Sequence, residues 1–176
     1  MAYKKFFPTS NDPFLLADAD MALAKFGHLN SLINYVNSEE IISGYGATAT
    51  LTSNQSATVI LLDRAAGTTF TLPSATVDMV GTNFTFFRNT TLSANSVVNT
   101  SGTDTFVGTV VLNKTTATTG TSYYTSTVNK TFTETFTTVT AGIVGSTFTI
   151  TCIAAGKWAI SGNLFHSGTA ANPFSN

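Results

Sequence analysis

From residue 46 onward, apolar and polar residues alternate with a period of two, as expected of β-strands with one buried face. The clearest example is 147–152, where Phe148, Ile150 and Cys152 alternate with threonines. Segment 131–136 alternates in the same way, with one less regular face. Similar patterning predicts further strands at 47–52, 57–62, 68–72, 83–88, 105–112, 121–128 and 156–161.

Pairs of Gly-Thr or Gly-Ser precede several of these segments, as turn residues do in front of short strands. Their spacing is uneven, which argues against a solenoid repeat. The second half shows no crossover helix, so a parallel α/β sheet is not expected. We therefore predict a mainly β fold, an antiparallel β-sandwich or jelly roll. Its core should bury six residues: Val59, Leu61, Phe148, Ile150, Trp158 and Ile160.

The first 45 residues follow a different pattern. Residues 1–16 contain two prolines and predict an extended arm. A helix should follow, from Asp18 or Asp20 to Asn37, because apolar residues recur there at three- and four-residue steps. A helix with one apolar stripe needs a partner surface. We thus divide the chain into an arm and helix, 1–45, and a β domain, 46–176. The predicted interface residues are Phe6, Phe7, Phe14, Leu23, Phe26, Leu29, Ile33 and Val36.

The composition narrows the range of possible functions. Charged residues make up 10% of the 176-residue chain, against about 25% in an average globular domain. The net charge of −1 and the scattered basic residues give no footprint for nucleic acid. No apolar run is long enough for a membrane span, and no signal peptide is visible, so we expect synthesis in the host cytoplasm. Cys152 is the only cysteine, which excludes an intrachain disulfide.

Residues that could support catalysis are sparse. The histidines, His28 and His166, are far apart in the sequence and are interpreted as surface or interface residues. Too few metal-ligating residues cluster for a zinc site, and no cofactor motif is present. A glycosidase would need two carboxylates about 5–10 Å apart. The acids of the β domain are interpreted as solvated instead; they are Asp63, Asp78, Asp104 and Glu134.

Two other features allow more than one interpretation. Asp63 and Arg64 follow an apolar strand, and they are either a turn with a local ion pair or a charged contact between subunits. Tyr123 and Tyr124 are adjacent, so in a strand one of them points outward. An outward tyrosine could stack on a sugar ring or fill an interface.

Three stretches resemble a family of small virion structural proteins. Residues 22–30, Ala-Leu-Ala-Lys-Phe-Gly-His-Leu-Asn, are similar to the A-R-F-G-H-L-N stretch of such proteins in marine and cyanobacterial phages and related large DNA viruses. Residues 61–76, containing Asp-Arg-Ala-Ala-Gly, are similar to a second run in these proteins, and 156–175 resembles their W…G…P-F close. The chain departs from them at Lys25, where the family has Arg, and in lacking a long Gly/Ser linker. The family supplies no catalytic residues.

The resemblance implies a virion structural protein, located in the capsid. We expect a non-enzymatic capsid decoration or minor capsid protein that contacts the major capsid protein or other virion proteins through its N-terminal arm. A homo-oligomer is expected, with a trimer favoured. The alternatives are a receptor-binding or fibre-type virion protein that recognises host glycans, and a glycan-hydrolysing enzyme.

Overall fold

The computed structural model describes residues 41–135 and 141–176. The chain divides into two units, Met1–Glu39 and Glu40–Asn176. The predicted arm, the amphipathic helix and all eight predicted interface residues lie outside the described residues. Ile41 and Ile42, which the sequence division placed with the arm, pair with the strand at 58–62. We call the second unit the β domain.

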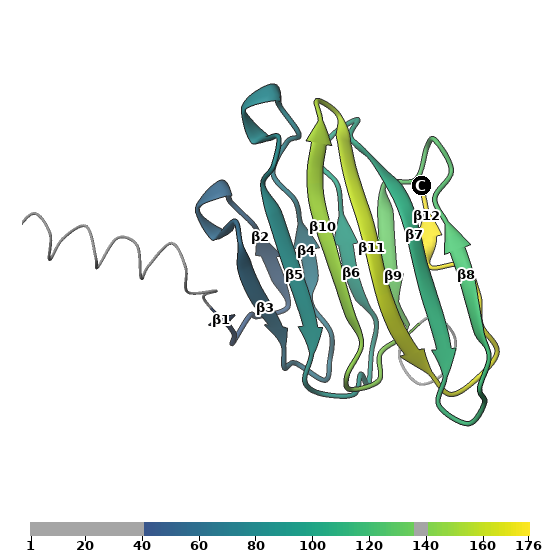
Figure 1. The fold of residues 1–176 in the computed structure, drawn as a ribbon. Coiled ribbons are helices and arrows are strands. Elements are labelled where there is room, and N and C mark those ends of the chain that lie inside the picture. Colours follow the sequence, from purple (N-terminus) through teal and green to yellow (C-terminus); the bar gives the residue numbers. More distant parts are fainter. Residues whose placement is uncertain (1–40, 136–140) are drawn as a thin grey trace, which may run out of the picture. The chain divides into compact units, whose positions relative to one another are not determined.

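The β domain consists of two sheets (Figure 1). In spatial order, the larger sheet contains β1 (Ile41–Ile42), β3 (Thr58–Leu62), β5 (Asn83–Arg88), β10 (Thr147–Ala154), β11 (Lys157–His166), β7 (Thr105–Lys114) and β8 (Gly120–Tyr124). The smaller sheet contains β12 (Phe174–Ser175), β9 (Thr131–Glu134), β6 (Ser96–Asn99), β4 (Thr69–Thr71) and β2 (Thr48–Thr50). Two short 3-10 helices, η1 (Ser53–Gln55) and η2 (Val77–Met79), lie in the connections. The mainly β prediction is confirmed.

The predicted antiparallel arrangement is wrong, because both sheets are mixed. From β1 to β7 the chain alternates between the two sheets, so that β1, β3 and β5 pair in parallel, as do β2, β4 and β6. Parallel strands need a long crossover connection, usually a helix. Here the strand in the opposite sheet is that crossover. The chain thus winds back and forth between the two sheets. Because its successive turns differ in length, the sequence shows no fixed repeat.

The C-terminal half completes the larger sheet by insertion. Strands β10 and β11 form an antiparallel hairpin between β5 and β7, and β11 pairs in parallel with β7 (Figure 1). The hairpin therefore lies between two strands, β5 and β7, that both come before it in the sequence. The edge strand β8 closes one side of this sheet, and β1 closes the other.

The core lies between the two sheets and is rich in aromatic rings. Phe70 of β4 lies 5.4 Å from Phe86 of β5, and Phe132 of β9 lies 4.7 Å from Phe148 of β10, measured between ring centroids. Both pairs join one sheet to the other. Phe148 is directly opposite Gly162 in the register, and a Cβ on that glycine would come within 2.5 Å of the Cβ of Phe148. Glycine at 162 thus allows β11 to approach the backbone and Cβ of Phe148 closely.

Four of the six predicted core residues are buried: Phe148, Ile150, Trp158 and Ile160. Val59 and Leu61 are only partly covered, and their neighbours Ile60 and Leu62 are buried instead. The face of β3 was therefore assigned wrongly. Its run Val-Ile-Leu-Leu is apolar on both faces, so alternation could not identify the inner one.

Candidate functional site

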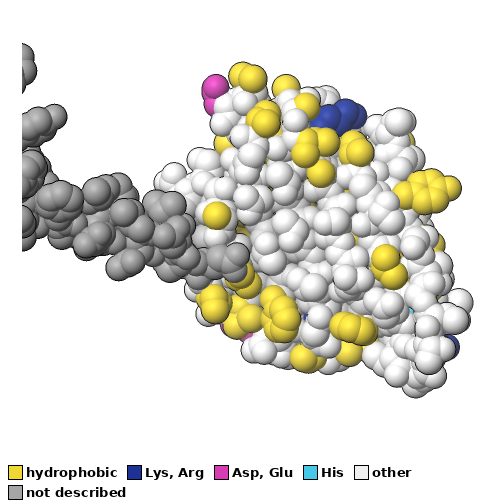
Figure 2. All heavy atoms as spheres, in the orientation of Figure 1, with side chains coloured by type: hydrophobic (Ala, Val, Ile, Leu, Met, Phe, Trp, Pro, Cys, Tyr) yellow, Lys and Arg dark blue, Asp and Glu magenta, His cyan; other side chains and the backbone are white. Residues whose placement is uncertain are grey.

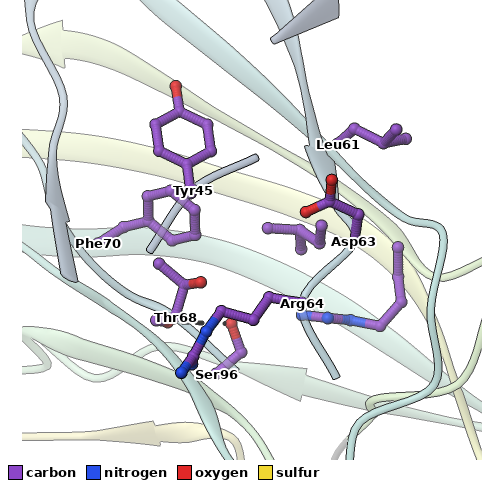
Figure 3. Close-up of a pocket in the computed structure, with 9 residues that line it drawn as sticks. Tyr45, Leu61, Asp63, Arg64, Thr68, Phe70 and Ser96 are labelled. Carbon is purple, nitrogen blue, oxygen red and sulfur yellow. Dashed lines mark hydrogen bonds between the residues drawn. The ribbon is translucent and has the colours of Figure 1, made fainter. Parts of the chain in front are cut away.

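The Asp63–Arg64 segment forms the corner between β3 and β4 (Figure 3). Asp63 accepts a hydrogen bond from the Gly44 amide at 3.1 Å, and the Arg64 guanidinium donates to the carbonyl oxygen of Gly67. Gly67 has a φ of 71°, and a Cβ there would come within 2.0 Å of the Asn95 carbonyl oxygen. Within the described residues no ion pair joins Asp63 to Arg64. The predicted local ion pair is wrong, since Arg64 binds the backbone of the turn and Asp63 binds the Gly44 amide, 19 positions earlier in the sequence.

The recess beside this corner is filled by side chains. Tyr45 packs edge-on against Phe70, with ring centroids 5.1 Å apart, and the Ser96 hydroxyl donates to the Thr68 carbonyl at 3.1 Å (Figure 3). The volume left for a water-sized molecule is about 0 Å³. The corner is therefore a packed structural element without room for a ligand.

A buried ion pair joins the two sheets, and its Arg88 also lines this recess. Arg88 ends β5 in the larger sheet, and Glu134 ends β9 in the smaller one. Each residue is 1% exposed. Arg88 Nε donates to Glu134 Oε1 at 3.3 Å, and Nη2 donates to Oε2, so the guanidinium forms a bidentate interaction with both carboxylate oxygens. The interpretation of Glu134 as solvated is wrong.

Asp104 is also buried rather than solvated. Its Oδ2 accepts a hydrogen bond from the Ala75 amide at 2.7 Å, which fixes the segment that leads into η2. Both corrections have the same cause, because a carboxylate can be buried when a specific donor compensates its lost hydration. Single acidic residues in the sequence do not reveal such partners.

His166 and Cys152 are buried in the larger sheet. His166 continues the inward-facing positions of β11, so its prediction as a surface or interface residue is wrong. Burial raises the pKa of the Cys152 thiol, and the charge of Asp104 raises that pKa further. A thiol of this kind stays protonated and unreactive at neutral pH. Among residues 41–135 and 141–176, no three His, Cys, Asp or Glu side chains are grouped to hold a metal ion.

A groove beside the edge strand β8, lined by side chains that carry hydroxyl and amide groups, is the candidate functional site. It lies where β8, the β8–β9 connection and the segment leading into β12 meet, and its volume is about 460 Å³. Small-molecule sites typically measure about 300–1,000 Å³. We call it the β8 groove, and its lining residues are Ser122, Tyr123, Tyr124, Ser126, Asn129 and Asn172.

The two tyrosines differ in exposure, as adjacent strand residues should. Tyr123 is partly buried against the core and pairs with Val110, whereas Tyr124 is 77% exposed. The end of β8 is held in place next to Tyr124, because Thr125 and Gly108 exchange two hydrogen bonds, each of 3.0 Å. The sequence therefore predicted correctly that one of the two tyrosines points outward.

Sequence reasoning missed the polar partners of these tyrosines. Asn129 and Asn172 lie 43 positions apart in the sequence, and only the fold brings them to one groove. No local pattern links them to β8.

Comparison of the chain with protein-family models, with curated proteins and with solved structures gives no match. No helix in the described part of the chain has the length and apolar character needed to cross a membrane.

Proposed function

We propose that the protein is a non-enzymatic structural component of a virus particle, a capsid decoration or minor capsid protein that attaches through its N-terminal segment. The contrast between the two parts of the chain carries this proposal. The β domain closes its core with its own side chains, whereas the N-terminal segment has a stripe of apolar residues in sequence. Such a stripe requires a partner surface, and capsid protein supplies one.

The surface of the β domain fits a role as the part of the protein that is exposed on the outside of the particle. Figure 2 shows one side of it, on which charged side chains are few, hydrophobic side chains are scattered, and most of the surface is backbone or uncharged polar side chains. Threonines contribute to the larger sheet, and the hydroxyls of Thr85 and Thr149 lie 3.2 Å apart on neighbouring strands. A surface with little charge repels copies of itself weakly, so it tolerates dense packing on a particle.

The resemblance to virion proteins supports the same role. The run at residues 61–76 corresponds to the end of β3, the corner containing Asp63 and Arg64, and β4. Because these residues build a turn between the two sheets, the similarity concerns the scaffold rather than a reactive site. This fits a protein that has a structural role.

Substitutions within the full-length chain test the attachment. Replacing Leu23, Phe26 and Leu29 together with serine removes three apolar side chains from the stripe, each worth roughly 1.5–3 kcal/mol when buried. We expect the variant to keep the thermal unfolding of the wild type but to be lost from purified particles. A matched variant with Ala24, His28 and Tyr35 changed to serine, on the opposite face of the predicted helix, should still be incorporated.

Two outcomes would contradict the attachment model. A large drop in thermal stability of the stripe variant would mean that the stripe belongs to the protein's own core. Normal incorporation of the stripe variant would mean that the segment is not the attachment device. Copy number in the particle separates the proposed role from its alternative, because hundreds of copies indicate the capsid and a few dozen indicate a fibre or tail.

We also propose that the protein assembles into a closed homo-oligomer, with a trimer favoured, since closed symmetry is the usual outcome for self-associating soluble chains. Light scattering at micromolar concentration should give about three times the 18.5 kDa chain mass. A stable monomer under these conditions would contradict the proposal.

A further inference from the structure

We infer that the β8 groove binds a neutral oligosaccharide. The inference goes beyond the proposed attachment to a particle and does not depend on it, because the groove belongs to the β domain alone. Tyr124 presents an exposed aromatic ring in this groove, whose other lining side chains carry hydroxyl or amide groups. A tyrosine ring offers an apolar face together with a hydroxyl, a combination suited to a sugar ring that has apolar C–H faces and polar edges.

The two asparagines of the groove present hydrogen-bond donors in fixed orientations. Asn129 Oδ1 accepts a hydrogen bond from the Ser126 amide at 2.6 Å, and Asn172 Oδ1 accepts one from the Phe174 amide at 3.0 Å. An asparagine amide also has an NH₂ group with two donors. Neither NH₂ group has a hydrogen-bond partner among the described residues.

This arrangement is preorganised. Asn129 is only 8% exposed, and its backbone carbonyl also accepts a hydrogen bond from the Phe106 amide at 2.8 Å. Asn172 is tied to the start of β12 through Phe174, which is buried in the core. Groups that are already fixed lose little conformational entropy when a ligand binds. The serine hydroxyls of residues 122 and 126 add donors and acceptors along the same groove.

Charge defines the class of ligand. The lining contains no Lys, Arg, His, Asp or Glu side chain. Phosphate, sulfate and nucleic acid are usually held by cationic side chains, so an anionic ligand has no counter-charge here. The combination of one exposed ring, oriented amide donors and hydroxyls fits a ligand rich in neutral hydroxyl groups. A volume of about 460 Å³ accommodates a short oligosaccharide rather than a large polymer segment.

The test uses the full-length protein on a glycan array printed with neutral hexose and N-acetylhexosamine oligosaccharides, together with sialylated and sulfated glycans. We expect the wild type to bind members of the neutral set. The best of these would then be titrated by isothermal calorimetry to give a dissociation constant. Tyr124→Ala should weaken that binding about tenfold or more, because an aromatic anchor is lost. Tyr124→Phe keeps the ring and should retain most of the affinity.

A second variant tests the amide donors. Asn172→Asp keeps the acceptor for the Phe174 amide but replaces the NH₂ donors with an oxygen, so it should also weaken binding about tenfold. Val128→Ala is the control, because Val128 is exposed in the β8–β9 connection, beside Asn129 in the sequence, but is not part of the groove lining. Its affinity should equal that of the wild type. Circular dichroism and thermal unfolding verify that every variant is folded.

Several results would overturn the inference. These are no binding to any neutral glycan, preference for the sialylated or sulfated glycans, or an unchanged affinity in both Tyr124→Ala and Asn172→Asp. Selection of a peptide from a displayed library that depends on Tyr124, with no glycan bound, would identify a peptide site instead. Loss of particle attachment without loss of glycan binding would contradict nothing here, and it would separate this inference from the proposed function.

Discussion

Replacing Glu134 with leucine should lower the free energy of unfolding by about 3–5 kcal/mol, because it leaves the Arg88 guanidinium buried without its partner. Both side chains of the pair are almost fully enclosed between the two sheets. Taking a charge out of water costs several kcal/mol, and the opposite charge offsets that cost only while both are present. Chemical denaturation of the purified protein, followed by circular dichroism, measures the change.

The double variant Arg88→Met with Glu134→Leu is the decisive comparison. Removing both charges abolishes the desolvation cost, so this variant should be close to the wild type in stability or above it. Asp78→Asn is the control for losing a carboxylate as such, since Asp78 is exposed in η2 and its replacement should change stability by less than about 0.5 kcal/mol. Equal destabilisation of the single and double variants would mean that the site matters for packing and not for charge.

Trp158→Ala should also destabilise the protein by about 3–5 kcal/mol, because it leaves a large cavity in the core. Trp158 is 0% exposed, lies between Cys152 and Phe106 in the register, and has its ring centroid 6.0 Å from that of Phe84. Since it is the only tryptophan, its fluorescence reports on this core directly. Emission of the native wild type should be blue-shifted and should move to longer wavelength on unfolding.

Trp158→Phe separates the effect of lost side-chain volume from the effect of the buried indole N–H. The indole Nε1 is buried without a hydrogen-bond partner in the described part of the chain. Phenylalanine keeps much of the ring and removes this unsatisfied donor, whose burial costs about 1–3 kcal/mol. The loss of stability should therefore be much smaller than in Trp158→Ala. An emission maximum typical of full solvent exposure in the native protein, or similar losses in both variants, would contradict this account of the core.

The strands of the β domain could be predicted from the sequence where alternation is clean. The segment around Phe148 and Ile150 forms β10, and the segment at 83–88 forms β5 with the predicted bounds. Strands β1 and β12 have two residues each, too few to establish a period, and they were not predicted. Strand β6 was missed as well, although β9 has the same length and was predicted. Strand pairing, rather than local pattern, defines these segments.

The candidate site, too, could be predicted only in part from the sequence. Adjacency of Tyr123 and Tyr124 in a strand is enough to place one ring outward, since successive side chains point to opposite faces. The sequence gives no indication that Asn129 and Asn172 join Tyr124, because they follow β8 at unrelated distances along the chain. Their convergence depends on β12 pairing with β9 at the edge of the smaller sheet.

Taken by itself, the sequence determined that the chain is mainly β, that Phe148, Ile150, Trp158 and Ile160 are core residues, and that its charge is low. These properties follow from local periodicity and composition. The tertiary structure decided which strands pair in parallel, which face of β3 turns inward, and that Arg88 meets Glu134. Each of these depends on contacts between residues distant in the sequence, whose free energy no local pattern records.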